Sequence, residues 1–334
     1  MTFLKPLNTL RPFYLTTKTT SFQREFNLRL KDAGHILGSS FVELEVYEDK
    51  KLKRIVFSGD LGNKNKPIVH DPQRPSHADY VFIESTYGDR NHKSFQESKE
   101  ELLEAIRYTV GKGGNVIIPS YALERAQEII YVLREFYEER KLPKCDIFLD
   151  SPLAISIIKL FTTHPEFYDR EAYNIFLQKN PFELPNLHFT REVEESKAIN
   201  SISSGAIIIA GSGMLNGGRV LHHLKYNLWR EECSIVFVGY QPKGTLGRRI
   251  IEGAQKVKIF SEEIEIKAKV FTINGFSSHA DQEGLLEWLS YTKRPKKVFL
   301  IHGEEEKTEI FGKAIKEHLN FDWHIPEEGE VLNL

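Results

Sequence analysis

Apolar and polar residues alternate along residues 26–31 and again along 41–47, and a short apolar run follows at 54–57. Alternation of this kind places every second side chain on one face of a strand. A further run of the type found in buried strands covers 80–84. The first three runs are therefore predicted to form a meander of strands.

The pattern changes after residue 94 to helices that alternate with short apolar strands. This alternation is typical of a parallel, doubly wound sheet with helices on its faces. Ser94 is a plausible N-cap for the first of these helices, and Gly111 follows its predicted end. Helices are predicted over 94–110, 122–140, 152–162, 166–178, 193–200, 218–228 and after 247, and strands over 115–118, 146–149, 206–210 and 234–238.

Strands are predicted again after residue 256, at 257–260 and 264–273, followed by a helix at 281–292. A strand at 297–301 and a helix at 304–318 complete the pattern. A strand-rich part, an α/β part and a mixed part in this order indicate an α/β domain inserted into another domain. We therefore expect one domain in two segments, 1–88 and 263–334, with 89–262 as the insert.

Composition excludes several classes of protein. An apolar fraction of 40% and a charged fraction of 28% are typical of a globular protein. A net charge of −2 excludes a chain that is basic throughout, but not a local basic cleft. Two cysteines cannot form a disulfide framework in a chain of this size, and they suit a reducing compartment. No apolar run approaches the roughly 20 residues of a membrane helix, and no apolar leader is found, so a cytoplasmic location is predicted.

Three ligand-type residues each stand beside glycine just after a predicted strand. They are His35 in Ala-Gly-His-Ile-Leu-Gly-Ser, Asp60 in Ser-Gly-Asp-Leu-Gly and His302 in Ile-His-Gly-Glu. A carboxylate flanked by glycine suits a hard cation or a bridge between two cations. Taken alone, Asp60 also fits an Asx-turn, and each histidine also fits a packing or capping role. Together they predict most of a binuclear metal site.

Two further residues have a context that suits catalysis. His279 precedes a predicted helix in Gly-Phe-Ser-Ser-His-Ala-Asp, where it can donate a proton or hold a phosphate oxygen. The same segment also fits a simple N-cap, with Ser278 or Asp281 as the capping residue. Glu84 ends a buried strand and is expected to orient one of the histidines, although an ordinary strand-end acid has the same pattern.

The glycine-rich loop 211–218 is a candidate anion site. It lacks the Gly-Lys-Ser/Thr ending of a Walker loop. It still places backbone N–H groups and a helix N-terminus at the end of a strand, an arrangement that favours anions. Each base near it also fits a solvated face. The predicted contacts with a phosphodiester backbone are Ser212, Gly213, Arg219, Arg125, Lys243 and Arg248.

The order of the motifs is more specific than any one of them. His35 and Asp60 in their motifs are followed by Glu-Ser-Thr-Tyr-Gly-Asp-Arg, Gly-Ser-Gly-Met-Leu, Gly-Tyr-Gln, Gly-Phe-Ser-Ser-His-Ala-Asp and His-Gly-Glu. This series resembles the metallo-β-lactamase/β-CASP family of nucleases, which cut RNA. The resemblance runs from about residue 26 to the C-terminus.

The resemblance implies an α/β fold in which a parallel-sheet β-CASP domain is inserted into part of a metallo-β-lactamase αββα sandwich. It implies that His35 binds a first zinc ion, His302 a second, and that Asp60 bridges the two. Glu84 resembles the acid of the first β-CASP motif, and His279 resembles the histidine proposed to protonate the leaving oxygen. Asp60, Glu84 and His279 are thus the predicted catalytic residues, RNA the predicted substrate, and homodimerisation a property that relatives suggest.

One departure from the family pattern affects the predicted activity. Family members open with a longer segment that holds a His-x-His-x-Asp-His cluster, whereas the first histidine of this sequence is His35. Each zinc would keep one ligand of its own plus the shared Asp60, fewer than the three or four that zinc sites usually have. We therefore expect this chain alone to bind zinc weakly and not to hydrolyse RNA. It is interpreted as a fragment of a zinc-dependent ribonuclease, and a separate N-terminal polypeptide that completes the metal site is a predicted partner.

Two alternatives remain open at this point. One is a non-catalytic RNA-binding or scaffold relative, and the other is a metallo-β-lactamase-fold hydrolase of a small ester. The persistence of His35, Asp60, His279 and His302 in their motifs favours the nuclease fragment over the scaffold. The long insert with its anion-binding loops argues against a small substrate.

Overall fold

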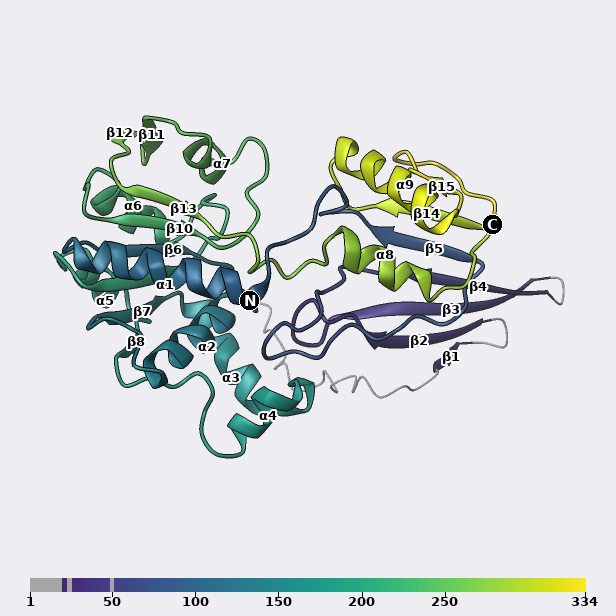
Figure 1. Ribbon diagram of the computed structural model, residues 1–334, viewed down its shortest axis with the longest axis horizontal. Coiled ribbons are helices and arrows are strands. Elements are labelled where there is room, and N and C mark those ends of the chain that lie inside the picture. The colour runs from purple at the N-terminus through teal and green to yellow at the C-terminus, as the bar shows by residue number, and fades with distance from the viewer. Residues whose placement is uncertain (1–19, 23–25, 49–50) are drawn as a thin grey trace, which may run out of the picture. The chain divides into compact units, whose positions relative to one another are not determined.

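The computed structural model describes residues 20–22, 26–48 and 51–334. The first 19 residues of the predicted segment 1–88 lie outside the described residues. The chain divides into two compact units, each with its own sheet (Figure 1). The first comprises Met1–Lys64, Asp71–Asp89 and Asp281–Leu334, and the second Asn65–His70 and Arg90–Ala280.

The first unit contains a mixed sheet that has seven strands among the described residues, in the order β1-β2-β3-β4-β5-β14-β15. Neighbours from β1 to β4 are antiparallel, whereas β4, β5, β14 and β15 run parallel. The predicted meander is confirmed. The strands are β1 (Thr20–Phe22), β2 (Phe26–Asp32), β3 (Ser40–Glu48), β4 (Lys51–Phe57), β5 (Tyr80–Glu84), β14 (Lys297–Ile301) and β15 (Trp323–His324).

Two helices, α8 (Gln282–Ser290) and α9 (Glu305–Leu319), belong to this unit. Asp281 caps α8 by accepting a hydrogen bond from the Gly284 backbone at 2.9 Å, and Trp288 of α8 packs edge-on against Phe41 of β3. On the other face of the sheet, Phe57, Phe82 and Phe299 form a stacked ladder across β4, β5 and β14. Aromatic stacking therefore ties the three parallel strands together.

The second unit contains a parallel sheet with six strands among the described residues, in the order β13-β10-β6-β9-β7-β8. Strands β6, β9 and β10 are buried along their whole length, because their continuous apolar runs pack on both faces. The predicted parallel sheet is confirmed. The strands are β6 (Val116–Pro119), β7 (Asp146–Asp150), β8 (Leu187–Phe189), β9 (Ala206–Ala210), β10 (Ser234–Phe237) and β13 (Lys269–Thr272).

Helices connect these strands. The first begins at a capping box formed by Ser94 and Glu97, and the predicted helix 166–178 is divided because Asp169 caps a new helix after a 3₁₀ turn at Pro165–Phe167. The helices are α1 (Phe95–Gly111), α2 (Arg125–Glu138), α3 (Pro152–Thr163), α4 (Arg170–Phe176), α5 (Val193–Ile199), α6 (Val220–Asn227) and α7 (Leu246–Ile251).

The end of the second unit differs from our expectation. The predicted strand 264–273 is two strands, and its first part, β12 (Glu262–Glu265), pairs with β11 (Lys256–Ile259) in a separate hairpin. Its second part, β13, pairs in parallel with β10. By compactness, the first unit resumes at Asp281.

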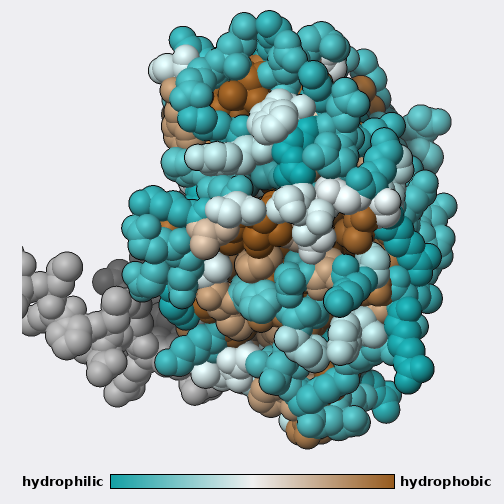
Figure 2. Space-filling model, turned by 90° about the vertical axis from the view of Figure 1, so that its left-hand side faces the viewer, coloured by the Kyte–Doolittle hydropathy of each residue, from teal (hydrophilic) through white to brown (hydrophobic). Residues whose placement is uncertain are grey.

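The surface of the second unit is mainly hydrophilic on the side that Figure 2 presents, with small apolar patches between the polar residues. Its exposed large apolar side chains include Trp229, Phe189 and Val193. Scattered exposed residues of this kind are normal for globular proteins. Among the helices of the described residues, none combines the length and apolar character needed to cross a bilayer.

Candidate functional site

The predicted ligands of the first unit lie at one edge of its sheet. Strands β4, β5 and β14 are parallel neighbours, and β2 has the same direction because both β2 and β4 are antiparallel to β3. The carboxyl ends of these four strands therefore meet at one edge. His35, Asp60 and His302 follow three of them and Glu84 ends the fourth, so residues far apart in sequence converge.

Asp60 lies between the two predicted histidine ligands. Its Oδ1 is 3.2 Å from Nδ1 of His302, and its Oδ2 is 3.9 Å from Nε2 of His35. The side chains of Asp60 and His302 are 41% and 57% exposed, so solvent reaches them, whereas that of His35 is 12% exposed. Two imidazoles facing opposite oxygens of one carboxylate form a donor set that suits a pair of zinc ions.

The loop that carries His35 is held by short-range hydrogen bonds. Ser39 Oγ accepts from the backbone N–H groups of His35 and Ile36, at 3.0 and 3.2 Å. The backbone of Gly62 donates to the Ala33 carbonyl at 2.8 Å. A Cβ at Gly62 would lie only 1.7 Å from the Gly34 carbonyl oxygen, so glycine is required where the His35 and Asp60 loops meet.

Glu84 is buried and holds the turn that carries Asp60. Its Oε1 accepts a hydrogen bond from the Leu61 backbone at 2.6 Å, and its own backbone N–H donates to Ser58 Oγ at 3.0 Å. Glu84 and His302 also offer ligand atoms within 4.8 Å of each other. Glu84 therefore fixes the backbone next to Asp60 and stands close to the second histidine.

His302 leaves β14 in the left-handed conformation, with φ at 53°, a region that non-glycine residues rarely occupy. Thr86 Oγ1 donates to the His302 carbonyl at 3.1 Å and lies 3.3 Å from its Nδ1. A Cβ at the next residue, Gly303, would lie 2.3 Å from Ser85 Oγ. Close packing against the end of β5 therefore sets the turn that directs His302 toward Asp60.

His279 belongs to the second unit. Its backbone N–H donates to Ser277 Oγ at 3.3 Å, and its carbonyl accepts from His92 Nε2 at 3.2 Å. Its neighbour Ser278 accepts a hydrogen bond from Arg125 Nη2 at 3.0 Å. The segment around His279 is therefore held by contacts on both sides.

Two loops of the second unit meet at the carboxyl edge of its sheet, after β9 and β10. Gln241 Nε2 donates to the Gly213 carbonyl at 2.8 Å and so fastens the loops together. A Cβ at Gly213 would lie 3.0 Å from the ring of Tyr121, which follows β6. Ser212 Oγ accepts from the Asn216 backbone at 3.1 Å, and Lys243 is exposed on the second loop.

The three predicted phosphate-binding arginines have partners within the unit. Arg219 bonds to Asp150 Oδ1 at 2.8 Å and to the Arg191 carbonyl at 2.7 Å. Arg125 is buried and bonds to Glu128 and Ser278. Arg248 is half-buried and pairs with Glu252 at 2.7 Å. Of the four predicted basic contacts, Lys243 is the one that is exposed.

Asp150, at the end of β7, was not singled out from the sequence. Its fully buried carboxylate accepts hydrogen bonds from Thr190, Ser196, Arg219 and His223, at 2.6–2.8 Å. Burial opposes its ionisation, but the hydrogen bonds, led by that from His223, outweigh burial and lower the pKa of Asp150 to about 2. The sequence signal that could have identified Asp150 is an acidic residue at the end of a buried strand.

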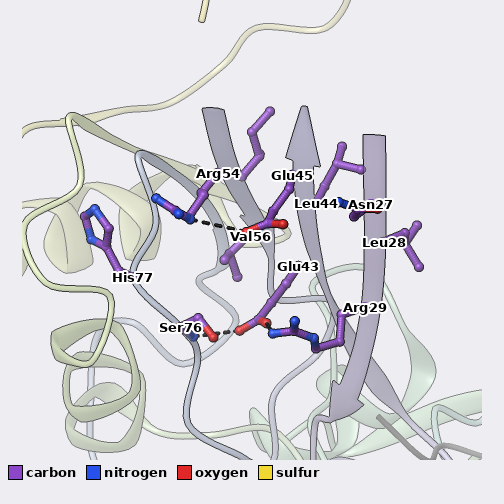
Figure 3. A pocket seen from close by; sticks show the side chains of 11 residues that line it. Asn27, Leu28, Arg29, Glu43, Leu44, Glu45, Arg54, Val56, Ser76 and His77 are labelled. Carbon is purple, nitrogen blue, oxygen red and sulfur yellow. Dashed lines mark hydrogen bonds and ion pairs between the residues drawn. The ribbon is translucent and has the colours of Figure 1, made fainter. Parts of the chain in front are cut away.

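A hollow of about 140 Å³ lies elsewhere on the first unit, over β2, β3 and β4 (Figure 3). Its charges are paired: Glu43 bonds to Arg29 at 3.2 Å and to the Ser76 backbone at 2.6 Å, and Glu45 bonds to Arg54 at 3.3 Å. It contains none of the predicted site residues, so we do not include it in the candidate site.

Comparison with known proteins identifies the class. The Beta-Casp domain family model matches residues 126–250, and the model of the Zn-dependent metallo-hydrolase RNA specificity domain matches residues 263–326. The chain is 32% identical over 312 residues to the RNase J-like protein of Methanocaldococcus jannaschii, covering 92% of this chain and 71% of that protein. The chain therefore belongs to the β-CASP metallo-β-lactamase family, and the predicted fold class is confirmed.

Two other relatives are similar over most of this chain. Ribonuclease TTHA0252 of Thermus thermophilus is 44% identical over 290 residues, which cover 86% of this chain and 65% of that protein. Transcription termination factor FttA of Methanocaldococcus jannaschii is 30% identical over 328 residues, which cover 95% and 51%. The chain thus spans between about half and two thirds of the length of these two relatives.

Proposed function

We propose that this chain provides part of a zinc-dependent ribonuclease that hydrolyses phosphodiester bonds in RNA. The observation that carries the proposal is Asp60, whose two carboxylate oxygens face the imidazoles of His302 and His35 at 3.2 and 3.9 Å. The family model of a Zn-dependent metallo-hydrolase and the ribonuclease among the relatives support it.

In this proposal His35, Asp60 and His302 would hold the zinc, with the Asp60 carboxylate between the two histidines. When bound, the metal supplies Lewis-acid stabilisation of the negative charge that develops on the scissile phosphate. Glu84 keeps the Asp60 turn in place through the Leu61 backbone. Ser39 holds the His35 loop in place through the His35 backbone.

His279 is proposed to donate a proton to the departing ribose oxygen. An imidazole is well suited to this step because its ordinary pKa lies near neutrality. The hydrogen bonds of His279 to Ser277 and His92 fix its backbone. Proton transfer is the role that we assign to its side chain.

The second unit is proposed to bind the RNA backbone at the carboxyl edge of its sheet. The Ser212 hydroxyl, the Gly213 backbone and the ammonium group of Lys243 are the proposed phosphate contacts, whereas the backbone N–H of Ser212 donates to the Gly217 carbonyl at 3.3 Å. A parallel sheet commonly binds anionic ligands outside the carboxyl ends of its strands. Arg219, Arg125 and Arg248 are assigned to shaping this edge through their contacts within the unit.

Three residues supply too few ligands for two complete zinc sites. We therefore propose that full activity requires further ligands beyond His35, Asp60 and His302. Weak zinc binding by this chain alone, a separate polypeptide that completes the site, homodimerisation and a cytoplasmic location stay predictions. The similarity to FttA favours one second candidate for the biological process, a role in transcription termination.

The test is cleavage of an end-labelled RNA, with zinc and with or without a metal chelator, by a form of the protein in which further ligands complete the metal site; this chain alone is expected not to cleave. We expect cleavage that the chelator abolishes, and that His279→Ala slows while the zinc content stays unchanged. Loss of zinc in that variant would show that His279 is a ligand and not a proton donor. RNA binding without any zinc uptake would instead identify a scaffold and overturn the nuclease proposal.

A further inference from the structure

The side chains of Lys66, Glu128 and Arg125 form a network of ion pairs in the second unit. Glu128 of α2 is fully buried, and its Oε1 lies 2.5 Å from Nζ of Lys66. Its Oε2 accepts a hydrogen bond from Nη1 of Arg125, one turn earlier on the same helix. One carboxylate is therefore shared between the buried Arg125 and Lys66, whose side chain is 9% exposed, and these two cations come from different segments of the chain.

Both cations also bond to the same loop, residues 275–279. Arg125 Nη2 donates to Ser278 Oγ at 3.0 Å. Lys66 Nζ donates to the Gly275 carbonyl at 3.2 Å. The Lys66–Glu128–Arg125 network thus bonds to the loop at Gly275 and at Ser278, and Ser278 is the residue directly before His279.

The rest of this loop is packed against α1. The ring of Phe276 is fully buried and meets Phe95 edge-on at 5.5 Å. The ammonium group of Lys66 lies 4.8 Å from the centre of the Phe95 ring. A Cβ at Gly275 would lie 2.1 Å from Ser98 Oγ, so the backbone of the loop is pressed onto the helix and has little room to move.

Burial of these charges carries an energetic cost. Burial lowers the pKa of Lys66 to about 8, with the nearby Glu128 opposing the shift. Apolar residues of similar volume often stabilise a protein as well as a buried ion pair does. A stability role alone therefore accounts poorly for two cations around one carboxylate, whereas directional hydrogen bonds to a loop account for them well.

We propose that Arg125, braced by Glu128 and Lys66, is a positioning residue that holds the loop 275–279 so that His279 is presented in one conformation. This inference rests on the proposed role of His279 as proton donor. Arg125 does not touch the reacting atoms in this scheme. It acts through Ser278, and its planar guanidinium fork can bond to Glu128 and Ser278 at the same time.

The first measurement is hydrogen exchange of the backbone amides of residues 274–280. Loss of a charge-assisted hydrogen bond in Arg125→Met is expected to speed their exchange by about 10- to 100-fold. Arg125→Lys keeps a cation beside Glu128 and is expected to restore part of the protection. Exchange can be measured whether or not the protein cleaves RNA.

Arg134→Met is the matched control. Arg134 is buried on the same helix, bonds to Glu138 and lies over the ring of Tyr131 at 4.6 Å. Its loss is expected to lower thermal stability but leave exchange of residues 274–280 unchanged. Equal exchange in wild type and Arg125→Met would overturn the inference, as would equal acceleration by Arg134→Met.

A second measurement separates positioning from stability. The side-chain NMR signals of His279 are expected to be single in wild type and in Arg134→Met, and broadened or doubled in Arg125→Met. If the protein cleaves RNA, kcat of Arg125→Met is expected to fall about 10- to 100-fold with KM nearly unchanged. Absence of cleavage by a form with a completed zinc site would defeat the proposed function, while the exchange and NMR results would still decide whether Arg125 positions the loop.

Discussion

Glu84 accepts a hydrogen bond at 2.6 Å from the backbone N–H of Leu61. The contact joins the end of β5 to the turn that carries Asp60. Because Glu84 is buried at its strand end, the position of the Asp60 carboxylate depends on a second carboxylate that is 24 residues away from it in the sequence. The proposed metal site of this unit is thus linked to the integrity of the β4–β5 edge.

Replacement of Glu84 is expected to weaken zinc binding without removal of a predicted zinc ligand. Loss of a partner that orients a ligand typically lowers metal affinity by about 10- to 100-fold, and we expect this for Glu84→Ala. Glu84→Gln keeps an oxygen that can accept from Leu61 and is expected to lose less. Competition with a chromophoric zinc chelator measures both. Equal zinc affinity in Glu84→Ala and wild type would contradict the role given to Glu84.

Gly62→Ala is expected to destabilise the first unit. Its Cβ would lie 1.7 Å from the Gly34 carbonyl oxygen, so one of the two ligand loops must move. Overpacking of this kind typically costs about 1–3 kcal/mol. Urea unfolding measures the loss, and zinc binding is expected to weaken with it because His35 follows Gly34.

Gly111→Ala is the control for that substitution. Nothing lies within 4 Å of a Cβ at Gly111, which is the last residue of α1. Its unfolding free energy is expected to be unchanged or higher by a few tenths to about 1 kcal/mol. If the two variants unfold at the same urea concentration, the close approach of the His35 and Asp60 loops does not constrain the sequence.

Acid is expected to remove stability that Asp150 provides to the second unit. Its pKa is about 2 in the folded protein against an ordinary value of 3.8. A lowered carboxyl pKa stabilises the fold at pH values above the ordinary pKa. This contribution is lost as the pH falls through about 4 toward 2. The shift corresponds to about 2 kcal/mol.

Urea unfolding of wild type and Asp150→Asn across this pH range checks the prediction. The variant is expected to be less stable at pH 6 because it leaves Arg219 and His223 without the carboxylate. The difference between the two proteins should shrink by about 2 kcal/mol on acidification to pH 2. A difference in unfolding free energy that stays constant with pH would show that the Asp150 carboxylate does not provide the acid-sensitive part of the stability.

Substitution of Lys243 is expected to change RNA binding, whereas substitution of Arg219 is expected to change stability. Lys243 is exposed, so Lys243→Ala should weaken RNA binding and reduce the salt dependence of binding by about one phosphate contact. Arg219→Ala should lower thermal stability, because the guanidinium group bonds to the buried Asp150. Fluorescence anisotropy with labelled RNA at several salt concentrations and thermal unfolding separate the effects. An unchanged salt slope in Lys243→Ala would remove Lys243 from the RNA site.

Much of the fold of the first unit could be predicted from local pattern, and the same pattern singled out the residues that we propose as metal ligands. Alternation at 26–31 and 41–47 predicted β2 and β3, and glycine beside His35, Asp60 and His302 predicted tight turns after strands. The convergence of these residues follows from strand direction, which the sequence expresses only through the order of its elements.

The buried charges could not be predicted in the same way. Lys66 lies among polar residues in the sequence, and Arg125 and Glu128 lie on an amphipathic helix. The local pattern therefore predicts that each of them is exposed to solvent. Their burial depends on partners from distant segments. The sequence also did not predict that β13 joins the sheet of the second unit beside β10. Alternation along 264–273 predicts a strand but does not indicate which strand it pairs with.

Anomalous diffraction at the zinc edge, from crystals of this protein grown with zinc, tests the central claim most directly. We expect a peak about 2.0–2.2 Å from an oxygen of Asp60 and from a nitrogen of His35 or His302. The same crystals of Asp60→Asn should show a much weaker peak. Zinc bound elsewhere, with Asp60, His35 and His302 all out of contact with the metal, would contradict the account.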